Sequence, residues 1–348
     1  MNHRTYQGGS RDRSVALRLC GYSGPLIRSG HVSELRRRSA RPVKSSGRLR
    51  LLAASTVCGT AAVLAAVAPT AVAAEPDGKT LVVLGDSFSA NAEILDLLDT
   101  GGDVGCKHVP TSWPTQLTQR LGLSPDDVED TSCQGASLDT SGWTLVHQVK
   151  RAMSEGAFGP RTRTVTIQLG MNDTWGADNP VGMNHAVTCL IDLAAGCGPE
   201  AATQGRTPDP EAITGPAYAG RVRQVVEYLR YYAPNARIVF VGYPEIHTPG
   251  QESACAGVLG VDFVQPRAGA ITRVLDHLDT AQREAAALLN VNFFDSRAVT
   301  AGHGACAPDS WVDGAFDPRT EPLGFPWHPS ARGDSAVAAG LQDWIARG

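Results

Sequence analysis

The sequence has few aromatic residues and lacks the short motifs that mark several common classes of site. Phe, Trp and Tyr make up 6% of the chain and are scattered, which argues against a sugar-binding platform built on an aromatic stripe. Neither a C-x-x-C pair nor H-E-x-x-H occurs, so we expect no metal site. The serine motif G-x-S-x-G is also missing, which excludes the commonest form of nucleophile elbow. The sequence contains no recognisable internal repeat.

The first 74 residues have the composition of a leader. Arginines are frequent up to Arg50, residues 51–74 are apolar and alanine-rich without charge, and this run ends in Ala71-Val72-Ala73-Ala74. A basic region, an apolar region and small residues in this order are typical of a secretory signal peptide. We therefore expect residues 1–74 to be removed and residues 75–348 to form one secreted, extracellular domain, with a retained membrane anchor as the alternative. About forty polar residues precede the signal, so we infer that translation begins near Val43.

Removal of the leader makes the protein acidic. The first 74 residues carry 12 basic and 2 acidic side chains, which leaves 19 basic and 33 acidic ones and a net charge of −14 for residues 75–348. A strongly acidic protein repels phosphates, so we expect no nucleic-acid partner. The remaining length is sufficient for one sizeable core.

Six of the eight cysteines lie after the leader. An even number of cysteines in an exported protein predicts disulfides. Six cysteines allow fifteen pairings. We favour the sequential one: Cys106–Cys133, Cys189–Cys197 and Cys255–Cys306.

Buried strands alternate with amphipathic helices along the chain. Four short, nearly continuous apolar stretches are typical of parallel strands covered on both faces: residues 80–84, 164–169, 237–242 and 291–294. Between them, segments such as Tyr218–Tyr232 and Ala268–Leu289 place apolar residues at i, i+3, i+4 and i+7. This alternation of strands and helices predicts a three-layer α/β/α sandwich around a mainly parallel sheet of about five strands. We expect Ala177–Pro210 and Gly242–Pro266 to be irregular.

A serine follows the first predicted strand directly, in Gly85-Asp86-Ser87. The carboxyl end of a strand in an α/β protein is where ligands usually bind, so Ser87 is a candidate nucleophile. A serine needs a base and donors for the negative charge that develops. Gly-Asp-Ser alone also forms ordinary turns, so the assignment depends on the rest of the chain.

Three further segments offer those groups. Asn172, just after the strand predicted at residues 164–169, has an amide that can donate to an oxyanion. Gly135 can aim its backbone N–H into a cleft because it has no Cβ. His328 stands between aromatic residues and prolines that can hold a base in one orientation, unlike the other six histidines after the leader. Each segment alone also fits an ordinary turn.

Together and in this order, the four segments resemble the SGNH hydrolases, the GDSL family of lipases and esterases. The resemblance covers the whole chain after the leader and is greatest to the secreted actinobacterial branch, which carries three disulfides. It implies a flavodoxin-like fold with Ser87 as the nucleophile and His328 as the base. It also implies an oxyanion hole made by the backbone N–H groups of Ser87 and Gly135 and by the side chain of Asn172.

One position departs from the family pattern. Many members have an aspartate three residues before the histidine, where this chain has Phe325. A histidine needs an acceptor for its Nδ1–H. Some secreted members are similar in using a main-chain carbonyl, so we assign this role to the carbonyl of Phe325. A carboxylate, Asp317 or Asp313, is the alternative.

The resemblance implies a serine esterase or lipase that hydrolyses carboxylic esters through an acyl-enzyme, without metal or cofactor. Acyl lipids, including phospholipids, are the favoured substrates, before short esters and acetylated polysaccharide. A peptidase and, in a different class, a non-catalytic secreted binding protein are the alternatives. We expect a monomer that binds an ester or lipid substrate and has no stable membrane anchor.

Overall fold

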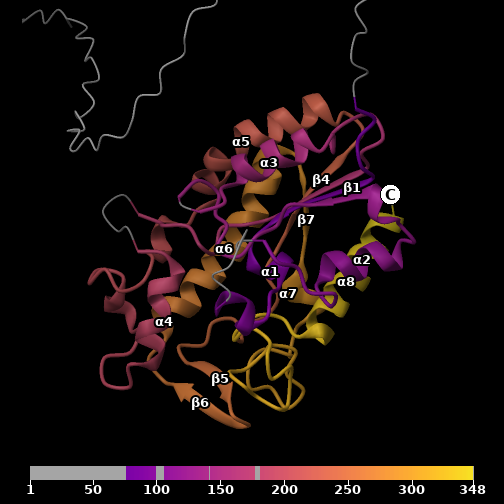
Figure 1. The fold of residues 1–348 in the computed structure, drawn as a ribbon. Helices are drawn as coiled ribbons and strands as arrows, with labels where there is room; N and C mark the ends of the chain where they lie inside the picture. Colours follow the sequence, from indigo (N-terminus) through magenta and orange to yellow (C-terminus); the bar gives the residue numbers. More distant parts are fainter. Residues whose placement is uncertain (1–75, 99–105, 141, 177–180, 348) are drawn as a thin grey trace, which may run out of the picture. The chain divides into compact units, whose positions relative to one another are not determined.

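Five parallel strands form the central sheet, in the order β2-β1-β3-β4-β7 (Figure 1). The computed structural model describes residues 76–347 apart from 99–105, 141 and 177–180, so the predicted leader lies outside the described residues. The expected, mainly parallel sheet of about five strands is confirmed. The strands are β1 (Leu81–Gly85), β2 (Val128–Asp130), β3 (Thr164–Gln168), β4 (Arg237–Val241) and β7 (Asn292–Phe294).

Helices cover both faces of this sheet. Alternate residues of β1 point to opposite faces: Val82 and Leu84 pack with α3, α5 and α6, whereas Leu81 and Val83 pack with α2 and α8. These side chains are at most 1% exposed, and burial of one such side chain contributes about 1.5–3 kcal/mol. The expected three-layer sandwich is therefore confirmed. The helices are α1 (Ser87–Ala90), α2 (Trp113–Arg120), α3 (Leu145–Ser154), α4 (Met183–Ile191), α5 (Gly215–Tyr232), α6 (Gly269–Leu289), α7 (Ser296–Val299) and α8 (Ala331–Ala346).

Side chains at the helix ends explain where the helices begin. The Thr214 hydroxyl accepts the N–H of Ala217 at 3.3 Å, and Pro216 occupies the first turn of α5. The Ser330 hydroxyl accepts the N–H of Gly333 at 3.4 Å at the start of α8. This second cap also ends the loop that carries His328.

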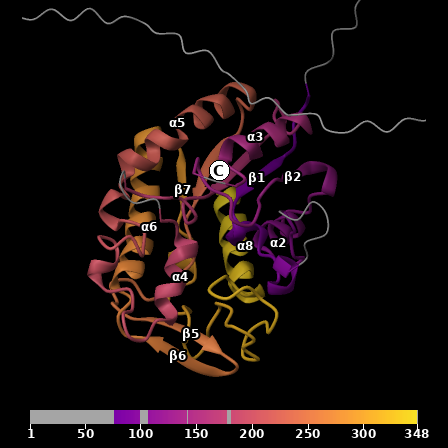
Figure 2. The same cartoon turned by 60° about the vertical axis from the view of Figure 1, so that its left-hand side comes forward.

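The two segments expected to be irregular contain regular structure, which corrects that prediction. Helix α4 lies in the first, and an antiparallel hairpin, β5 (Ala254–Val258) and β6 (Val261–Gln265), lies in the second. Leu259 and Gly260 turn the hairpin with φ values of 51° and 84°. The Gln265 side chain donates to the Leu190 carbonyl at 3.1 Å, and α4 lies beside the hairpin (Figure 2).

Three disulfides join the six cysteines after the leader. Cys106 pairs with Cys133, Cys189 with Cys197, and Cys255 with Cys306, which are the sequential pairs favoured above. In the part of the chain that the structure describes, no helix is both long and apolar enough to cross a bilayer.

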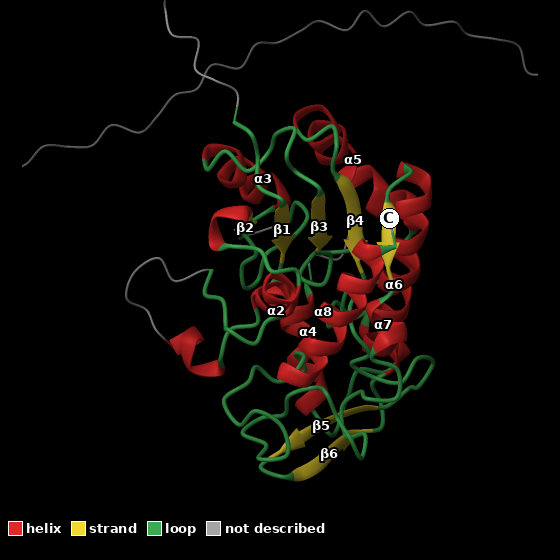
Figure 3. Cartoon of the chain, turned by 90° about the vertical axis from the view of Figure 1, so that its right-hand side faces the viewer, coloured by secondary structure: helices red, strands yellow, loops and turns green. Residues whose placement is uncertain are grey.

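The carboxyl ends of β1, β3 and β4 point to the same edge of the sheet (Figure 3). Loops gather at this edge, where α/β proteins bind their ligands. The candidate residues on the loops after β1 and β3 therefore come together there.

Candidate active site

A tight turn at the end of β1 presents Ser87 as the first residue of α1. A Cβ on Gly85 would lie 2.2 Å from the Ser89 hydroxyl, so only glycine fits at the end of the strand. The Asp86 carboxylate caps α1 through a backbone N–H of the first turn at 2.9 Å. Ser87 is buried, and its Oγ lies 2.8 Å from Nε2 of His328.

Hydrogen bonds on both ring nitrogens define the tautomer of His328. Nδ1 lies 3.1 Å from the carbonyl oxygen of Pro326, which can only accept, so Nδ1 carries the hydrogen. Nε2 is then left with a lone pair and accepts the hydroxyl hydrogen of Ser87. The imidazole is thus arranged to take a proton from Ser87.

Burial keeps this imidazole neutral. It lowers the pKa of His328 from 6.5 to about 4, and the hydrogen bond to the Pro326 carbonyl opposes the fall. The ring of Phe88 stacks on the imidazole with centroids 4.3 Å apart, which shields it from water. At neutral pH His328 is therefore in the form that a general base requires.

The acceptor at Nδ1 is Pro326 and not Phe325, which corrects our assignment. The Phe325 carbonyl accepts the backbone N–H of His328 at 3.0 Å and so closes a turn. Pro326 is the second residue of this turn, and Trp327, with φ 63°, is the third, which is the backbone pattern of a type II β-turn. The Phe325 carbonyl is therefore bonded within the turn, and the carbonyl of Pro326 is the one that accepts Nδ1–H of the imidazole.

Neither alternative carboxylate contacts the imidazole. Asp317 pairs with Arg319 at 2.7 Å, and this hydrogen bond lowers the pKa of Asp317. Asp313 accepts the N–H of Glu321 at 3.1 Å, and burial, with Glu321 beside it, raises the pKa of Asp313 to about 8. The hydrogen bond between Asp313 and His328 is made by their backbones: the Asp313 N–H donates to the His328 carbonyl at 2.8 Å.

Gly135 lies in a turn that follows β2. Its φ of 69° is the left-handed conformation that glycine adopts at little cost. The turn is closed by the N–H of Ala136, which donates to the Cys133 carbonyl at 3.1 Å. The disulfide from Cys133 to Cys106 holds the start of this turn.

Asn172 lies in the loop after β3. The loop begins at Gly170, whose φ of 124° is in the region that favours glycine. The Asn172 amide donates one hydrogen to the Ala136 carbonyl at 2.9 Å, next to Gly135. An amide has two such hydrogens, so one is left to donate elsewhere.

All four predicted residues line one cavity of about 500 Å³. Within the described residues, the backbone N–H groups of Ser87 and Gly135 have no protein acceptor. These donors and the remaining hydrogen of the Asn172 amide are therefore available to an oxygen beside Ser87. The structure brings together Ser87, Gly135, Asn172 and His328, as the sequence predicted.

The rest of the cavity wall is mostly apolar. Side chains from α1 and the segment after it, from α4 and α6, from the loops after β3 and β4 and from the loop before α8 form it. Such a wall suits a hydrocarbon chain. The apolar lining consists of Phe88, Ala92, Ile94, Met171, Met183, Val187, Leu190, Ile246, Ile271, Leu275, Phe325, Pro326 and Trp327.

A buried carboxyl group supports the turn that carries Ser87. Asp86 accepts the hydroxyl of Tyr243 at 2.5 Å, and the Tyr243 oxygen in turn accepts the N–H of Met171 at 3.1 Å. Burial raises the pKa of Asp86 to about 7. The turn after β1 is thus tied to the loop after β3. The sequence gives no signal for this contact, because Tyr243 is 157 residues away.

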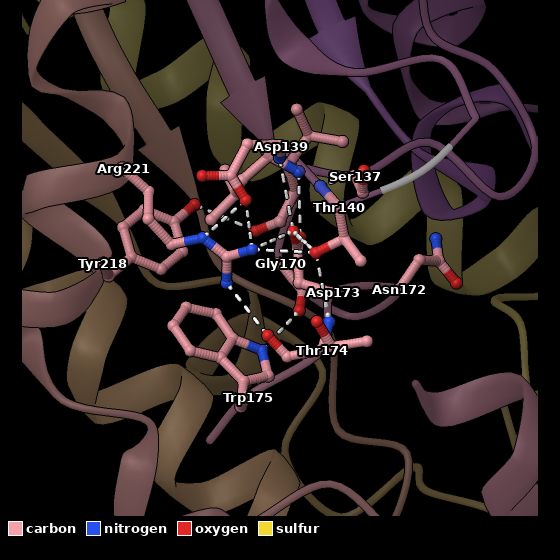
Figure 4. Close-up of polar contacts among 12 residues, drawn as sticks. Ser137, Asp139, Thr140, Gly170, Asn172, Asp173, Thr174, Trp175, Tyr218 and Arg221 are labelled. Carbon is pink, nitrogen blue, oxygen red and sulfur yellow. Dashed lines mark hydrogen bonds and ion pairs between the residues drawn. The ribbon is translucent and has the colours of Figure 1, made fainter. Parts of the chain in front are cut away.

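A second polar cluster lies behind Asn172 (Figure 4). Asp173, fully buried, accepts hydrogen bonds from the segment 138–140 and from Arg221 of α5. The sequence alone predicts a functional role for neither residue. The one feature that could have indicated Asp173 is that it directly follows Asn172. Asn-Asp is also common in ordinary polar turns, so this feature alone does not indicate a function.

A serine hydrogen-bonded to a neutral imidazole, at the carboxyl edge of a parallel sheet, is the arrangement that serine hydrolases use. The model of the GDSL-like lipase/acylhydrolase family matches residues 83–336, and the chain belongs to this family. It is a carboxylic ester hydrolase, which confirms the class expected from the sequence.

Several similar proteins come from Streptomyces. Lipase 1 of Streptomyces coelicolor is 29% identical over 271 residues, which cover 77% of this chain and 87% of that protein. An esterase of Streptomyces scabiei is 26% identical over 337 residues, covering 85% and 94%. The crystal structure of phospholipase A1 from Streptomyces albidoflavus has a TM-score of 0.53 at 22% identity, over 76% of this chain and 99% of that one, and shows the same fold.

Proposed function

We propose that the protein is a secreted lipase or esterase that cleaves acyl esters of lipids through an acyl-enzyme on Ser87. The observation that carries this proposal is the 2.8 Å hydrogen bond from Ser87 to a neutral His328 inside an apolar cavity. The predicted leader and the three disulfides support secretion, because disulfides persist in oxidising compartments.

In the acylation step, Oγ of Ser87 bonds to the ester carbonyl carbon while its proton moves to Nε2 of His328. The electron pair of the carbonyl bond moves to the oxygen, which accepts hydrogen bonds from the N–H groups of Ser87 and Gly135 and from the Asn172 amide. The carbonyl bond then re-forms and the bond to the alcohol oxygen breaks. His328 gives its proton to the departing alcohol, and the acyl group stays on Ser87.

In the deacylation step, a water molecule takes the place of the alcohol. His328 removes a proton from the water as its oxygen attacks the acyl carbon, and the same three donors hold the oxyanion. Collapse of this intermediate breaks the bond to Ser87, which recovers its proton from His328. The carboxylic acid leaves, and the Pro326 carbonyl accepts the Nδ1–H throughout.

The cavity wall favours an acyl chain over an acetylated sugar. The polar side chains of the lining are those of Ser87, Gln134, Asn172, His247 and His328, and the lining residues from α4 and α6 are all apolar. An acetyl group would leave most of this surface without a partner, while a longer chain would bury it at about 25 cal/mol per Å². We therefore place lipid esters before polysaccharide acetyl esters.

The test compares Ser87→Ala with the unchanged protein on p-nitrophenyl esters from acetyl to palmitoyl, on a phospholipid and on acetylated xylan. We expect Ser87→Ala to lower kcat by about 10⁴-fold or more at an unchanged melting temperature. Ser154→Ala, at an exposed serine, is the matched control and keeps full activity. Retained turnover in Ser87→Ala would refute the mechanism, and a preference for acetylated xylan would refute the substrate class.

A further inference from the structure

Two of the three donors proposed for the oxyanion, Gly135 and Asn172, come from separate loops. Gly135 lies after β2 and Asn172 after β3, so the distance between them depends on what joins the loops. One link is direct, from the Asn172 amide to the Ala136 carbonyl at 2.9 Å. A single hydrogen bond at the rim of a cavity leaves freedom for movement, and the structure contains a stronger link behind it.

That stronger link is the carboxylate of Asp173. It accepts the N–H of Leu138 at 2.8 Å, the N–H of Asp139 at 3.3 Å and the hydroxyl of Thr140 at 2.9 Å. The Asp173 side chain is 0% exposed, so these bonds are shielded from water. One side chain from the loop of Asn172 thus holds three consecutive residues of the loop of Gly135.

Arg221 closes the cluster from α5. Its guanidinium donates to Asp173 at 2.8 Å, to the Thr140 hydroxyl at 2.8 Å and to the Thr174 carbonyl at 3.3 Å. It also pairs with Asp139 and lies 4.4 Å from the ring centroid of Trp175. Arg221 therefore contacts both loops and supplies the positive charge that a buried carboxylate needs.

Neither Asp173 nor Arg221 belongs to the reacting groups. Neither lines the cavity, and neither is hydrogen-bonded to Ser87 or His328 in the described part of the chain. In Figure 4 the side chain of Asn172 points away from the cluster. The cluster can affect the reaction only through the position of the backbone that carries Asn172.

We propose that Asp173 and Arg221 are positioning residues that hold the Asn172 amide at a fixed place relative to the Gly135 N–H. The proposal rests on the proposed function, because it assumes that these two groups bind the oxyanion. Donors that are held in advance stabilise the transition state without reorganisation. Loosening them therefore lowers kcat, while the apolar wall that binds the acyl chain is unaffected.

The first test is the steady-state kinetics of Asp173→Asn on p-nitrophenyl butyrate. Loss of one whole donor costs about 10²–10³-fold in kcat, so we expect a displaced donor to cost about 10- to 100-fold. KM should change less than about twofold, since ground-state binding is preserved. Arg223→Met, which removes an exposed arginine two residues further along α5, is the matched control and keeps kcat within about twofold. A raised KM at unchanged kcat would overturn the proposal.

The second test is a double-mutant cycle with Asn172→Ala. If Asp173 acts through Asn172, Asp173→Asn should cost less than about threefold in kcat once the Asn172 amide has been removed. A full, additive loss in the Asn172→Ala protein would show a general structural role and overturn the proposal. This outcome differs from failure of the proposed function, which would appear as retained turnover in Ser87→Ala.

A third variant keeps the proposal testable if Asp173→Asn does not fold. Thr140→Val removes one donor to Asp173 at nearly constant volume. In the same cycle we expect it to lower kcat about 3- to 10-fold alone and to have little effect beside Asn172→Ala. Equal losses with and without Asn172 would again overturn the positioning role.

Discussion

His328 and Asn172 line the same cavity, but the groups that hold them differ in charge. His328 is held by the neutral carbonyl of Pro326, and burial lowers its pKa. Asn172 lies in a loop that is anchored through the ion pair between the buried Asp173 and the partly buried Arg221. At Nδ1 of His328 the acceptor is the Pro326 carbonyl, whereas a buried carboxylate, that of Asp173, lies next to Asn172, which we propose as an oxyanion donor.

The comparison indicates where a neutral acceptor is sufficient and where a charged one is needed. A carbonyl is sufficient to fix the tautomer of His328, because the task needs only an acceptor at Nδ1. Joining two loops needs an acceptor for several donors at once, and a carboxylate provides this. Arg221 supplies the counter-charge of this buried carboxylate and also donates to the Thr174 carbonyl in the loop of Asn172.

The largest expected effect comes from the histidine side. His328→Asn removes the imidazole that is hydrogen-bonded to Oγ of Ser87 and takes its proton in the proposed mechanism, so we expect kcat to fall about 10⁴-fold or more. Steady-state hydrolysis of p-nitrophenyl butyrate measures this. His147→Asn, at an exposed histidine, is the control and should have normal activity. Substantial turnover by His328→Asn would mean that another base operates.

For Arg221, we expect the loss of kcat to depend on whether the substituted side chain keeps the positive charge. Arg221→Met leaves the Asp173 carboxylate buried without its counter-ion, and we expect kcat to fall about 100-fold. Arg221→Lys keeps the charge but loses the planar set of donors, and about tenfold is expected. The two variants are compared for kcat at equal temperature, together with their melting temperatures. Equal losses would show that charge has no part in the effect.

The pH dependence tests the absence of a carboxylate at His328. The imidazole must be neutral to accept a proton, and its pKa is lowered to about 4. Activity is therefore present above about pH 4 and falls as the pH drops through this value, about tenfold per pH unit below it. The measurement is the acid limb of kcat/KM between pH 3 and 7. A limb near 6.5, the ordinary value for histidine, would contradict the shielding of His328 by burial.

The smallest effect is expected for the two aspartates near the histidine loop. Asp313 and Asp317 do not contact the imidazole, so Asp313→Asn and Asp317→Asn should lower kcat less than about tenfold. Neutralising a true triad aspartate costs about 10⁴-fold. A loss of 10³-fold or more in either variant, measured as kcat on a fold with normal circular dichroism, would replace the Pro326 carbonyl with a carboxylate as the partner of His328.

The sequence predicted the central strands and the four lining residues because those signals are local. A run of apolar residues that ends in Gly-Asp-Ser, or in Gly-Met-Asn-Asp, indicates both the strand and the turn after it. Strand β2 was missed because it is a half-buried edge strand of only three residues. The β5–β6 hairpin was missed because its first strand contains glycine and cysteine, which have little strand preference, and because packing of Ala254 against α4 helps to stabilise it.

The details of the site that could not be predicted depend on geometry or on distant contacts. Phe325 and Pro326 are neighbours, and only the conformation of the turn decides which carbonyl reaches Nδ1. Asp173 and Arg221 are separated by 48 residues, and no local pattern in either segment indicates that they meet. Such contacts follow from the packing of α5 on the sheet.

The hydrogen bond between Ser87 and His328 joins residues 241 positions apart. It can form only after β1, β3 and β4 have paired and α8 has packed on the sheet, so hydrolysis reports on assembly of the whole domain. In a refolding experiment, recovery of helical circular dichroism should precede recovery of ester hydrolysis, because contacts so distant in sequence form slowly. The esterase assay would then serve as a sensitive measure of correctly folded molecules.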